Sequence, residues 1–446
     1  MFNFLKEKFH QNNRKERVVV LGIDGVPCSL LKRFIDEGIM PNLAALAGEG
    51  TLIDMTVTIP EISSTSWSTF MTGVNPGRHG IYGFMELQDG SYRWRFPNSS
   101  DLKSSTLWDI AGKNGKQSIV INVPSTYPAK ALNGILTAGF VALDLKKATY
   151  PESAYEYLKG IGYRMDVDTR KAQESSSALA EDIGKTFEIR KEAILHFLDN
   201  KDWDLFVGVV TETDRLHHYL WAALNDADHP QHTFFIDFYK KLDDFIGELY
   251  SRTGDDVPFF IISDHGFTTI KKEIYLNVWL KERGYLSFRK DRPESLEDMN
   301  PDSKVFVLDP ARFYIHLEGK YPNGSVSMSE YNTLRNEIKN ELLLLTFDGE
   351  KVIKSVFFKE ELYNGEMFDR APDLVVLSNE GFDMKGSINK TELSGNSFLT
   401  GGHTRDNALF FINRKINSKD VNIVDVGPTI MSLLGIHGSF DGKCLL

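Results

Sequence analysis

The stretch VVVLGIDG, Val18 to Gly25, decides the expected fold. Its apolar, β-branched run continues without a polar residue up to Asp24, and a glycine follows. Such a run is typical of a strand buried on both faces, as in a parallel sheet covered by helices. In sheets of this kind the functional residues lie just beyond the carboxyl ends of the strands. Asp24 is therefore both the end of a predicted strand and a candidate functional residue.

Similar apolar runs recur along the chain, at Ser118–Val123, Leu205–Val210 and Phe259–Ile262. Helical periodicity lies between them, for example at 30–35 and 238–249. Strands that alternate with helices predict βαβ units and a parallel sheet covered on both faces. We therefore expect an α/β fold with a mostly parallel sheet.

The segment from about 270 to 395 has a different character. It is richer in charge and carries Asn-Gly turn signals at 323–324 and 364–365. We interpret 275–395 as a smaller inserted cap or specificity region within one catalytic domain that spans 17–446. The apolar helical pattern at 421–435 predicts a helix that packs on the core of the main sheet.

Composition narrows the classes of function. The chain has 446 residues and a formal net charge of −11, whereas proteins that bind nucleic-acid polymers usually present a basic surface. Only two cysteines occur, Cys28 and Cys444, so neither a disulfide scaffold nor a thiolate zinc site is expected. We expect a small-molecule substrate, and the sequence gives no indication of oligomeric state.

No apolar run is long enough to cross a bilayer, and MFNFLKEKFHQNNRKER at residues 1–17 lacks the apolar centre of a signal peptide. A cytoplasmic location is expected. The terminal segment is predicted to be a frayed or docked helix, with a membrane-surface helix as the alternative.

Six acidic and imidazole side chains follow predicted strands, lie on a predicted helix or occupy a glycine-rich loop. Each alone has an ordinary explanation as a turn residue, a surface polar pair or a loop histidine. Together they form the inventory of carboxylates and imidazoles that two catalytic metal ions need. The set is Asp24, Asp214, His218, Asp264, His265 and His403.

Residues 60–73 hold the candidate nucleophile. A helix is predicted to begin just after Ser63, where free backbone N–H groups and the helix dipole favour an alkoxide and a bound phosphate. The alternative is that this hydroxyl only caps the helix. Six of the seven residues from Ser63 to Thr69 carry hydroxyls, so spacing alone selects none of them.

Taken in order, these motifs resemble the type I phosphodiesterase/nucleotide pyrophosphatase family of the alkaline phosphatase superfamily. The resemblance covers about 18–446 and includes the closing segments DVGPTIMSLLGI and DGK. It implies an alkaline-phosphatase-like fold. The segments that carry it are VLGIDG (20–25), MTGVNPGRHGI (71–81), TETDRLHH (211–218), ISDHGF (262–267) and GGH (401–403).

The resemblance also implies a hydrolase that cleaves phosphate esters through a covalent intermediate on Ser63, with Ser64 as the alternative nucleophile. It implies two divalent metal ions, usually zinc and in some relatives manganese. His218, not His217, keeps the family's D-x-x-x-H spacing. One metal would be surrounded by Asp24, Ser63, Asp264 and His265, and the other by Asp214, His218 and His403.

One position departs from the family. Nucleotide-cleaving members carry an asparagine shortly after the His-Gly-Ile motif, where this chain has Phe84. Asn122 could replace that hydrogen-bond donor, or could equally be a turn residue. The departure weakens a specific expectation of nucleotide pyrophosphatase activity, and the sequence after Ser63 also lacks the sulfatase pattern. Phe84, Trp67 and Tyr127 are aromatic candidates for a substrate pocket.

Phosphodiesters are the favoured substrate class. A phosphomonoesterase or phosphomutase of the same superfamily is the first alternative. A metal-binding protein without turnover is the second.

Overall fold

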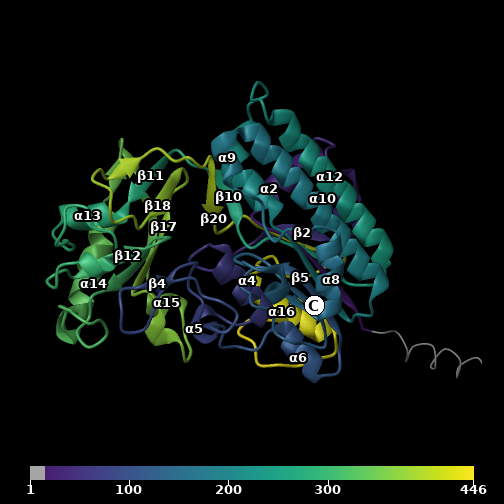
Figure 1. The fold of residues 1–446 in the computed structure, drawn as a ribbon, viewed down its shortest axis with the longest axis horizontal. Helices are drawn as coiled ribbons and strands as arrows, with labels where there is room; N and C mark the ends of the chain where they lie inside the picture. The colour runs from purple at the N-terminus through teal and green to yellow at the C-terminus, as the bar shows by residue number, and fades with distance from the viewer. Residues whose placement is uncertain (1–15) are drawn as a thin grey trace, which may run out of the picture.

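The computed structural model describes residues 16–446, so the helix predicted for the N-terminal segment lies almost entirely outside the described residues. An eight-stranded sheet runs through the molecule (Figure 1) in the order β2-β21-β9-β1-β8-β5-β6-β7. The five strands from β9 to β6 pair in parallel, and antiparallel strands complete both edges. The mostly parallel α/β sheet predicted from the sequence is confirmed. The strands are β1 (Val18–Ile23), β2 (Thr51–Met55), β5 (Ser118–Val123), β6 (Gly134–Ala138), β7 (Thr149–Tyr150), β8 (Leu205–Val210), β9 (Phe259–Ile262) and β21 (Ala408–Ile412).

Helices cover both faces of this sheet (Figure 1). Alternate residues of β1 enter different cores because successive strand side chains point to opposite faces. Val19, Leu21 and Ile23 pack with α2 (Cys28–Asp36), α3 (Pro41–Glu49), α10 (Ser176–Asn200) and α12 (His232–Thr253). Val18 and Val20 pack with α4 (Ser63–Thr72), α6 (Leu107–Lys113) and α16 (Ile423–Leu433).

A second set of small sheets forms the inserted region, on the left of Figure 1. It has a hydrophobic core of its own, which includes Trp279, Phe306 and Phe313. The predicted inserted region is present, and its predicted bounds of 275–395 remain a prediction. Its strands include β11 (Lys272–Tyr275), β12 (Val305–Leu308), β13 (Arg312–Ile315), β16 (Ile353–Phe358), β17 (Leu374–Ser378), β18 (Phe382–Lys385) and β19 (Ser394–Gly395), with helices α13 (Leu276–Glu282) and α14 (Met328–Leu342).

A two-stranded antiparallel ribbon lies where the inserted region meets the main sheet. It consists of β10 (Gly266–Thr269) and β20 (Gly401–Thr404). β10 begins four residues after β9 ends, so the ribbon brings a late segment of the chain to the carboxyl edge of the sheet. Across residues 16–446, none of the helices combines the length and the apolar character that spanning a bilayer requires.

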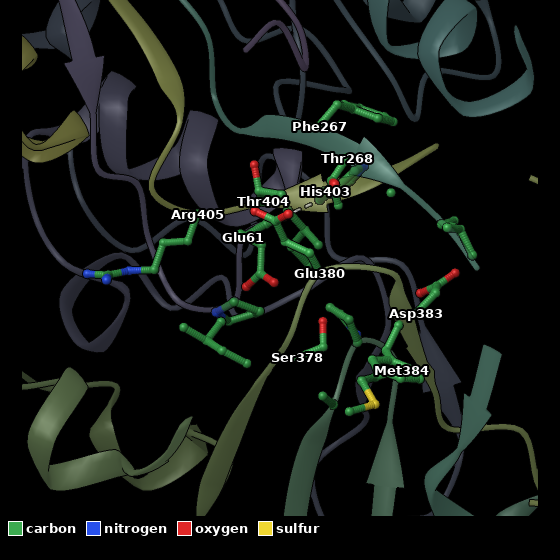
Figure 2. Close-up of a pocket in the computed structure, with 18 of the residues that line it drawn as sticks. Glu61, Phe267, Thr268, Ser378, Glu380, Asp383, Met384, His403, Thr404 and Arg405 are labelled. Carbon is green, nitrogen blue, oxygen red and sulfur yellow. Dashed lines mark hydrogen bonds between the residues drawn. The ribbon is translucent and has the colours of Figure 1, made fainter. Parts of the chain in front are cut away.

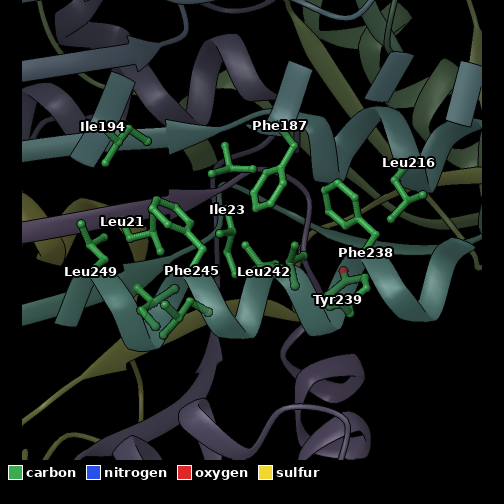
Figure 3. Packing of buried hydrophobic residues seen from close by; sticks show 14 of the residues in the cluster. Leu21, Ile23, Phe187, Ile194, Leu216, Phe238, Tyr239, Leu242, Phe245 and Leu249 are labelled. Atoms are coloured by element: carbon green, nitrogen blue, oxygen red, sulfur yellow. The ribbon is translucent and has the colours of Figure 1, made fainter. Parts of the chain in front are cut away.

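Truncation of a core aromatic tests the packing of α12 against the sheet. Phe245 is fully buried and packs near Phe187 and Leu21, as Figure 3 shows. Phe245→Ala is expected to lower the free energy of unfolding by about 3–5 kcal/mol, because it removes buried area and leaves a cavity. Denaturant unfolding measures this change. Leu344→Ala, at a side chain that is 78% exposed, is the control and should change the midpoint little; equal effects would contradict this account of the core.

Candidate metal centre

Three neighbouring strands of the sheet end at one place. Asp24 follows β1, and Asp264 and His265 follow β9, which pairs with β1 in parallel. β8 lies on the other side of β1 and leads into α11 (Glu212–Leu220), the helix that carries Asp214 and His218. The carboxyl ends of parallel strands share one edge of the sheet, so these side chains converge.

The remaining predicted ligand, His403, reaches the same place on β20 of the ribbon. Its Nε2 lies 3.0 Å from His218 Nε2 and 3.5 Å from Asp214 Oδ1. His218 Nε2 lies 3.3 Å from the same Asp214 oxygen. The structure therefore brings together all six predicted ligand side chains.

His265 lies between two groups of donor atoms. Its Nε2 is 3.6 Å from Asp24 Oδ1 and 3.4 Å from Asp264 Oδ2, and these three residues could hold one metal ion. The same nitrogen is 3.9 Å from Asp214 Oδ1, and Asp214, His265 and His403 form a second candidate group. The resemblance assigns His265 to the first group and His218 to the second, and His218 touches the second group's Asp214 and His403.

Each carboxylate is held by one oxygen and presents the other to the centre. The free oxygens of Asp214 (Oδ1) and Asp264 (Oδ2) are buried and accept no hydrogen bond from residues 16–446. Buried oxygens without a donor are costly unless a cation occupies the space between them. The oxygens already held are Asp24 Oδ2 by Trp67 Nε1 at 2.9 Å, Asp264 Oδ1 by the Gly25 N–H at 3.0 Å and Asp214 Oδ2 by Arg215 Nη1 at 2.6 Å.

The three histidines are oriented in the same manner. Each Nδ1 lies within hydrogen-bond distance of a backbone carbonyl, which can only accept, so Nδ1 carries a proton and Nε2 faces the centre. Ligating histidines are commonly fixed by such an outer hydrogen bond. The pairs are His218 with Gly401 O at 2.9 Å, His265 with Gly266 O at 3.1 Å and His403 with Glu61 O at 3.0 Å.

The buried carboxylates of the centre favour a bound cation. Burial, followed by repulsion from Asp264 and Asp214, raises the pKa of Asp24 well above its usual range. Burial also raises the pKa of Asp264 to about 6 and lowers that of His218 to about 4. The imidazole of His218 is therefore neutral at physiological pH, the form that binds metals. Carboxylate oxygens and neutral imidazoles fit zinc or manganese by donor chemistry.

Ser63 is the first residue of α4, and its hydroxyl faces the first donor group. Its Oγ lies 3.3 Å from Asp24 Oδ1 and 3.2 Å from His265 Nε2. The neighbouring Ser64 Oγ is buried and has no hydrogen-bond partner in the described chain, and Ser68 Oγ bonds the Ser64 carbonyl. Geometry thus distinguishes Ser63 from hydroxyls that sequence spacing leaves equivalent.

Asn122 is placed differently from Ser63. It is fully buried at the end of β5 and has a φ of 63°. Its amide nitrogen donates to the Val209 carbonyl at 3.0 Å and to Thr211 Oγ1 at 3.1 Å. Both amide hydrogens are engaged, so Asn122 offers no donor to a substrate in this conformation.

The aromatic candidates fall into two groups. Phe84 lines the cavity beside the centre and packs edge-on against Phe140. Trp67 is fully buried and Tyr127 packs against the hydrophobic core. Sequence reasoning missed the role of Trp67 as a donor to Asp24. The only available signal was its position four residues after Ser63, one helical turn further along.

A glycine makes room for the Trp67 ring. A Cβ on Gly22 of β1 would lie 2.5 Å from the ring atom Cη2 of Trp67. Real Cβ atoms do not approach other atoms so closely, so any side chain here would displace the indole. Gly22 thus permits the contact between Trp67 and Asp24.

A cavity of about 920 Å³ adjoins the centre (Figure 2). Glu61, Phe84, His218 and His403 line it on the side of the main sheet. On the other side it is lined by residues 376–385, from the inserted region. The cavity can therefore hold an organic group next to the candidate metal ligands.

The profile of type I phosphodiesterases/nucleotide pyrophosphatases matches residues 18–406, which include every predicted ligand and Ser63. The chain belongs to this family. It is accordingly a metal-dependent phosphoester hydrolase, and the resemblance seen in the sequence motifs is confirmed.

Solved structures support the fold of this family member. Phosphonoacetate hydrolase from Sinorhizobium meliloti 1021, in complex with phosphonoformate, superposes with a TM-score of 0.67 at 17% identity, over 94% of this chain and 96% of that one. Murine ectonucleotide pyrophosphatase/phosphodiesterase 5 gives a TM-score of 0.56 at 15% identity, over 96% and 97% of the two chains. Curated protein sequences give no match.

Loss of the Trp67 hydrogen bond tests the orientation of Asp24. Trp67→Phe is expected to weaken metal binding by about 10- to 100-fold, as is usual when a partner of a ligand is removed. Metal content after dialysis against graded chelator measures the change. Trp108→Phe, also buried in the core on this face of the sheet, is the matched control. Equal metal retention in both variants would contradict the role of Trp67.

Proposed function

We propose that this family member hydrolyses small phosphodiesters, with Ser63 as the nucleophile and two divalent metal ions, preferably zinc, as cofactors. The observation that carries the proposal is the position of Ser63 Oγ, within 3.3 Å of both Asp24 and His265 at the start of a helix. The ligands would be Asp24, Asp264 and His265 for one ion and Asp214, His218 and His403 for the other.

The residues of the chain perform distinct tasks in this proposal. Asp24 Oδ1 accepts the proton of Ser63, Ser63 Oγ attacks phosphorus in line, and the proton passes from Asp24 to the leaving oxygen, so that the first product departs as an alcohol. The N-terminus of α4 directs backbone N–H groups and its positive dipole end towards the phosphoryl oxygens. When bound, the metal ions would neutralise phosphoryl charge and favour the ionised hydroxyl.

The second step restores the enzyme. A water molecule attacks phosphorus of the phosphoseryl diester and gives one proton to Asp24, which passes it to Ser63 Oγ as the bond between phosphorus and Ser63 Oγ breaks. Each turnover thus converts a diester and water into a monoester and an alcohol. The buried position of Ser63, 6% exposed, limits access of other nucleophiles to the intermediate.

The charge state of Arg215, the cation beside the candidate ligand Asp214, supports a diester rather than a monoester. A monoester carries a second negative charge, which specialised enzymes meet with additional cationic side chains. Arg215 faces Asp214 and Asp166 with ion pairs of 2.6 and 2.8 Å, so its charge is already matched. The phosphomonoesterase or phosphomutase alternative therefore has less support from the described residues.

Replacement of the nucleophile is the decisive test. Ser63→Ala is expected to lower kcat for bis(4-nitrophenyl) phosphate by about 10³-fold or more, since the covalent route is lost. Ser64→Ala is the matched control, and it should keep activity within a few-fold. Metal content is measured on both variants. Activity that is retained in Ser63→Ala and lost in Ser64→Ala would transfer the role to Ser64.

Substrate preference is tested on the native, metal-loaded chain. We expect kcat/KM for bis(4-nitrophenyl) phosphate to exceed that for 4-nitrophenyl phosphate by about tenfold or more, because Arg215, the cation beside Asp214, is already matched by two carboxylates and cannot meet the monoester's extra charge. A reversed preference would favour the phosphomonoesterase alternative. Absence of turnover of both esters, with metal bound, would favour a metal-binding protein without turnover.

A further inference from the structure

The inserted region is attached to the main part of the molecule at both ends of their border. At one end the attachment is covalent, because the chain enters the inserted region from β10 and returns through β20. At the other end residues 363–367 of the inserted region contact α5 (Pro76–His79). In Figure 1 the ribbon lies at the upper end of the border and α5 at its lower end. The contact at α5 therefore restricts how far the inserted region can turn about the ribbon.

Backbone atoms of the two parts meet at this contact. The Met367 N–H donates to the Gly77 carbonyl at 2.8 Å, and the Asn364 N–H donates to Asn75 Oδ1 at 3.1 Å. A Cβ on Gly77 would lie 2.5 Å from the Asn364 carbonyl oxygen, which is closer than side chains are found to approach. A backbone carbonyl cannot turn aside as the end of a flexible side chain can. The missing side chain of Gly77 thus sets the separation of the two parts here.

The short helix α5 is anchored on the side of the main sheet. His79 Nε2 lies 2.9 Å from Thr69 Oγ1 on α4, the helix that begins at Ser63. Arg78 Nη1 donates to Asp441 Oδ1 at 2.7 Å, in the closing segment of the chain. A bulkier residue in α5 would therefore displace the inserted region and not α5 itself.

The contact lies at the end of the cavity beside the candidate metal centre. Tyr363 Oη donates to the Ile59 carbonyl at 2.6 Å, and residues 60–62, which follow Ile59, line the cavity on the main side. The inserted chain continues from the contact into β17, and residues 376–378 of β17 line the opposite wall. A displacement of residues 363–367 would thus move one wall of the cavity away from the other.

We propose that Gly77 is a positioning residue that sets the width of the cavity, and that it thereby determines how tightly the site holds the organic group of its phosphodiester. This inference rests on the proposed function, because the organic group belongs to the substrate of that site. Gly77 is not among the described residues that line the cavity, and it acts through the backbone of Asn364. A larger residue at this position widens the cavity and weakens binding of the organic group, while Ser63 and the candidate metal ligands stay in place.

Hydrogen exchange in Gly77→Ala tests the contact itself. The backbone of Gly77 lies outside the left-handed region, so alanine fits its conformation and only the added methyl group acts. Exchange of the Met367 amide should become about tenfold faster or more, because its bond to the Gly77 carbonyl opens more readily. Gly48→Ala on α3 is the matched control, since a Cβ there meets no atom within 4 Å. It should keep the native exchange rate.

Two chromogenic diesters measure the width of the cavity. Bis(4-nitrophenyl) phosphate and methyl 4-nitrophenyl phosphate release the same 4-nitrophenolate and differ only in the group that is retained. With the metal-loaded full chain, the ratio of kcat/KM for the aryl ester over the methyl ester should fall about fivefold or more in Gly77→Ala. The fall should arise in KM, because the displaced wall no longer contacts the retained ring. The ratio is taken within one variant, so a smaller folded fraction does not alter it, and Gly48→Ala should keep the native ratio.

Tyr363→Phe is the second variant, for the case that Gly77→Ala does not fold. It removes the hydrogen bond to the Ile59 carbonyl without adding bulk, and so loosens the same contact. The ratio for the two esters should fall by about twofold, which is less than the full value of one neutral hydrogen bond.

The outcomes separate this inference from the proposed function. A native ester ratio in folded Gly77→Ala, with or without faster exchange at Met367, would overturn the inference and leave the phosphodiesterase proposal standing. If Gly77→Ala does not fold, a native ratio in Tyr363→Phe would overturn it. Failure of the native chain to cleave either ester, with metal bound, would overturn the proposed function; native exchange at Met367 in Gly77→Ala would then overturn the inference as well, and faster exchange would support it.

Discussion

The crowding of three buried carboxylates at the edge of one sheet is the constraint on which the rest of the structure depends. Asp24, Asp214 and Asp264 repel one another, and burial adds to the cost of their charge. One donor holds each outer oxygen, and a backbone carbonyl holds the Nδ1 of each histidine so that Nε2 faces the centre. The inner oxygens are left for cations. The arrangement is thus stable as a metal site and unfavourable as an ordinary polar core.

The sheet supplies the rigidity that this crowding requires. The Gly25 N–H and Asp264 lie 239 residues apart in sequence, yet they bond because β1 and β9 are neighbours in parallel register. The last predicted ligand, His403, does not come from the main sheet but from the ribbon of β10 and β20, which also joins the inserted region. One wall of the cavity and one predicted metal ligand are therefore both attached to this ribbon.

Much of the fold could be predicted because buried parallel strands have a simple sequence pattern. The runs at Ser118–Val123, Leu205–Val210 and Phe259–Ile262 coincide with β5, β8 and β9. The convergence of the six predicted ligand residues could also be expected from the order of the motifs. Details that depend on tertiary contacts could not be predicted. Sequence spacing could not select Ser63 from its neighbouring hydroxyls. No local pattern shows that Trp67 donates to Asp24, or that Asn122 donates both amide hydrogens to the Val209 carbonyl and Thr211. The catalytic role of Ser63 itself stays a prediction.

Gly22 shows that the site constrains which residue can occupy the strand beneath it. A glycine within a strand costs roughly 0.5–1 kcal/mol relative to alanine, because it leaves the unfolded chain more freedom. Here the missing side chain admits the indole that steadies Asp24, so the sheet gives up some stability at the place where the chemistry needs order. Attempts to raise thermal stability by replacing strand glycines would therefore meet a trade-off between stability and activity at this position.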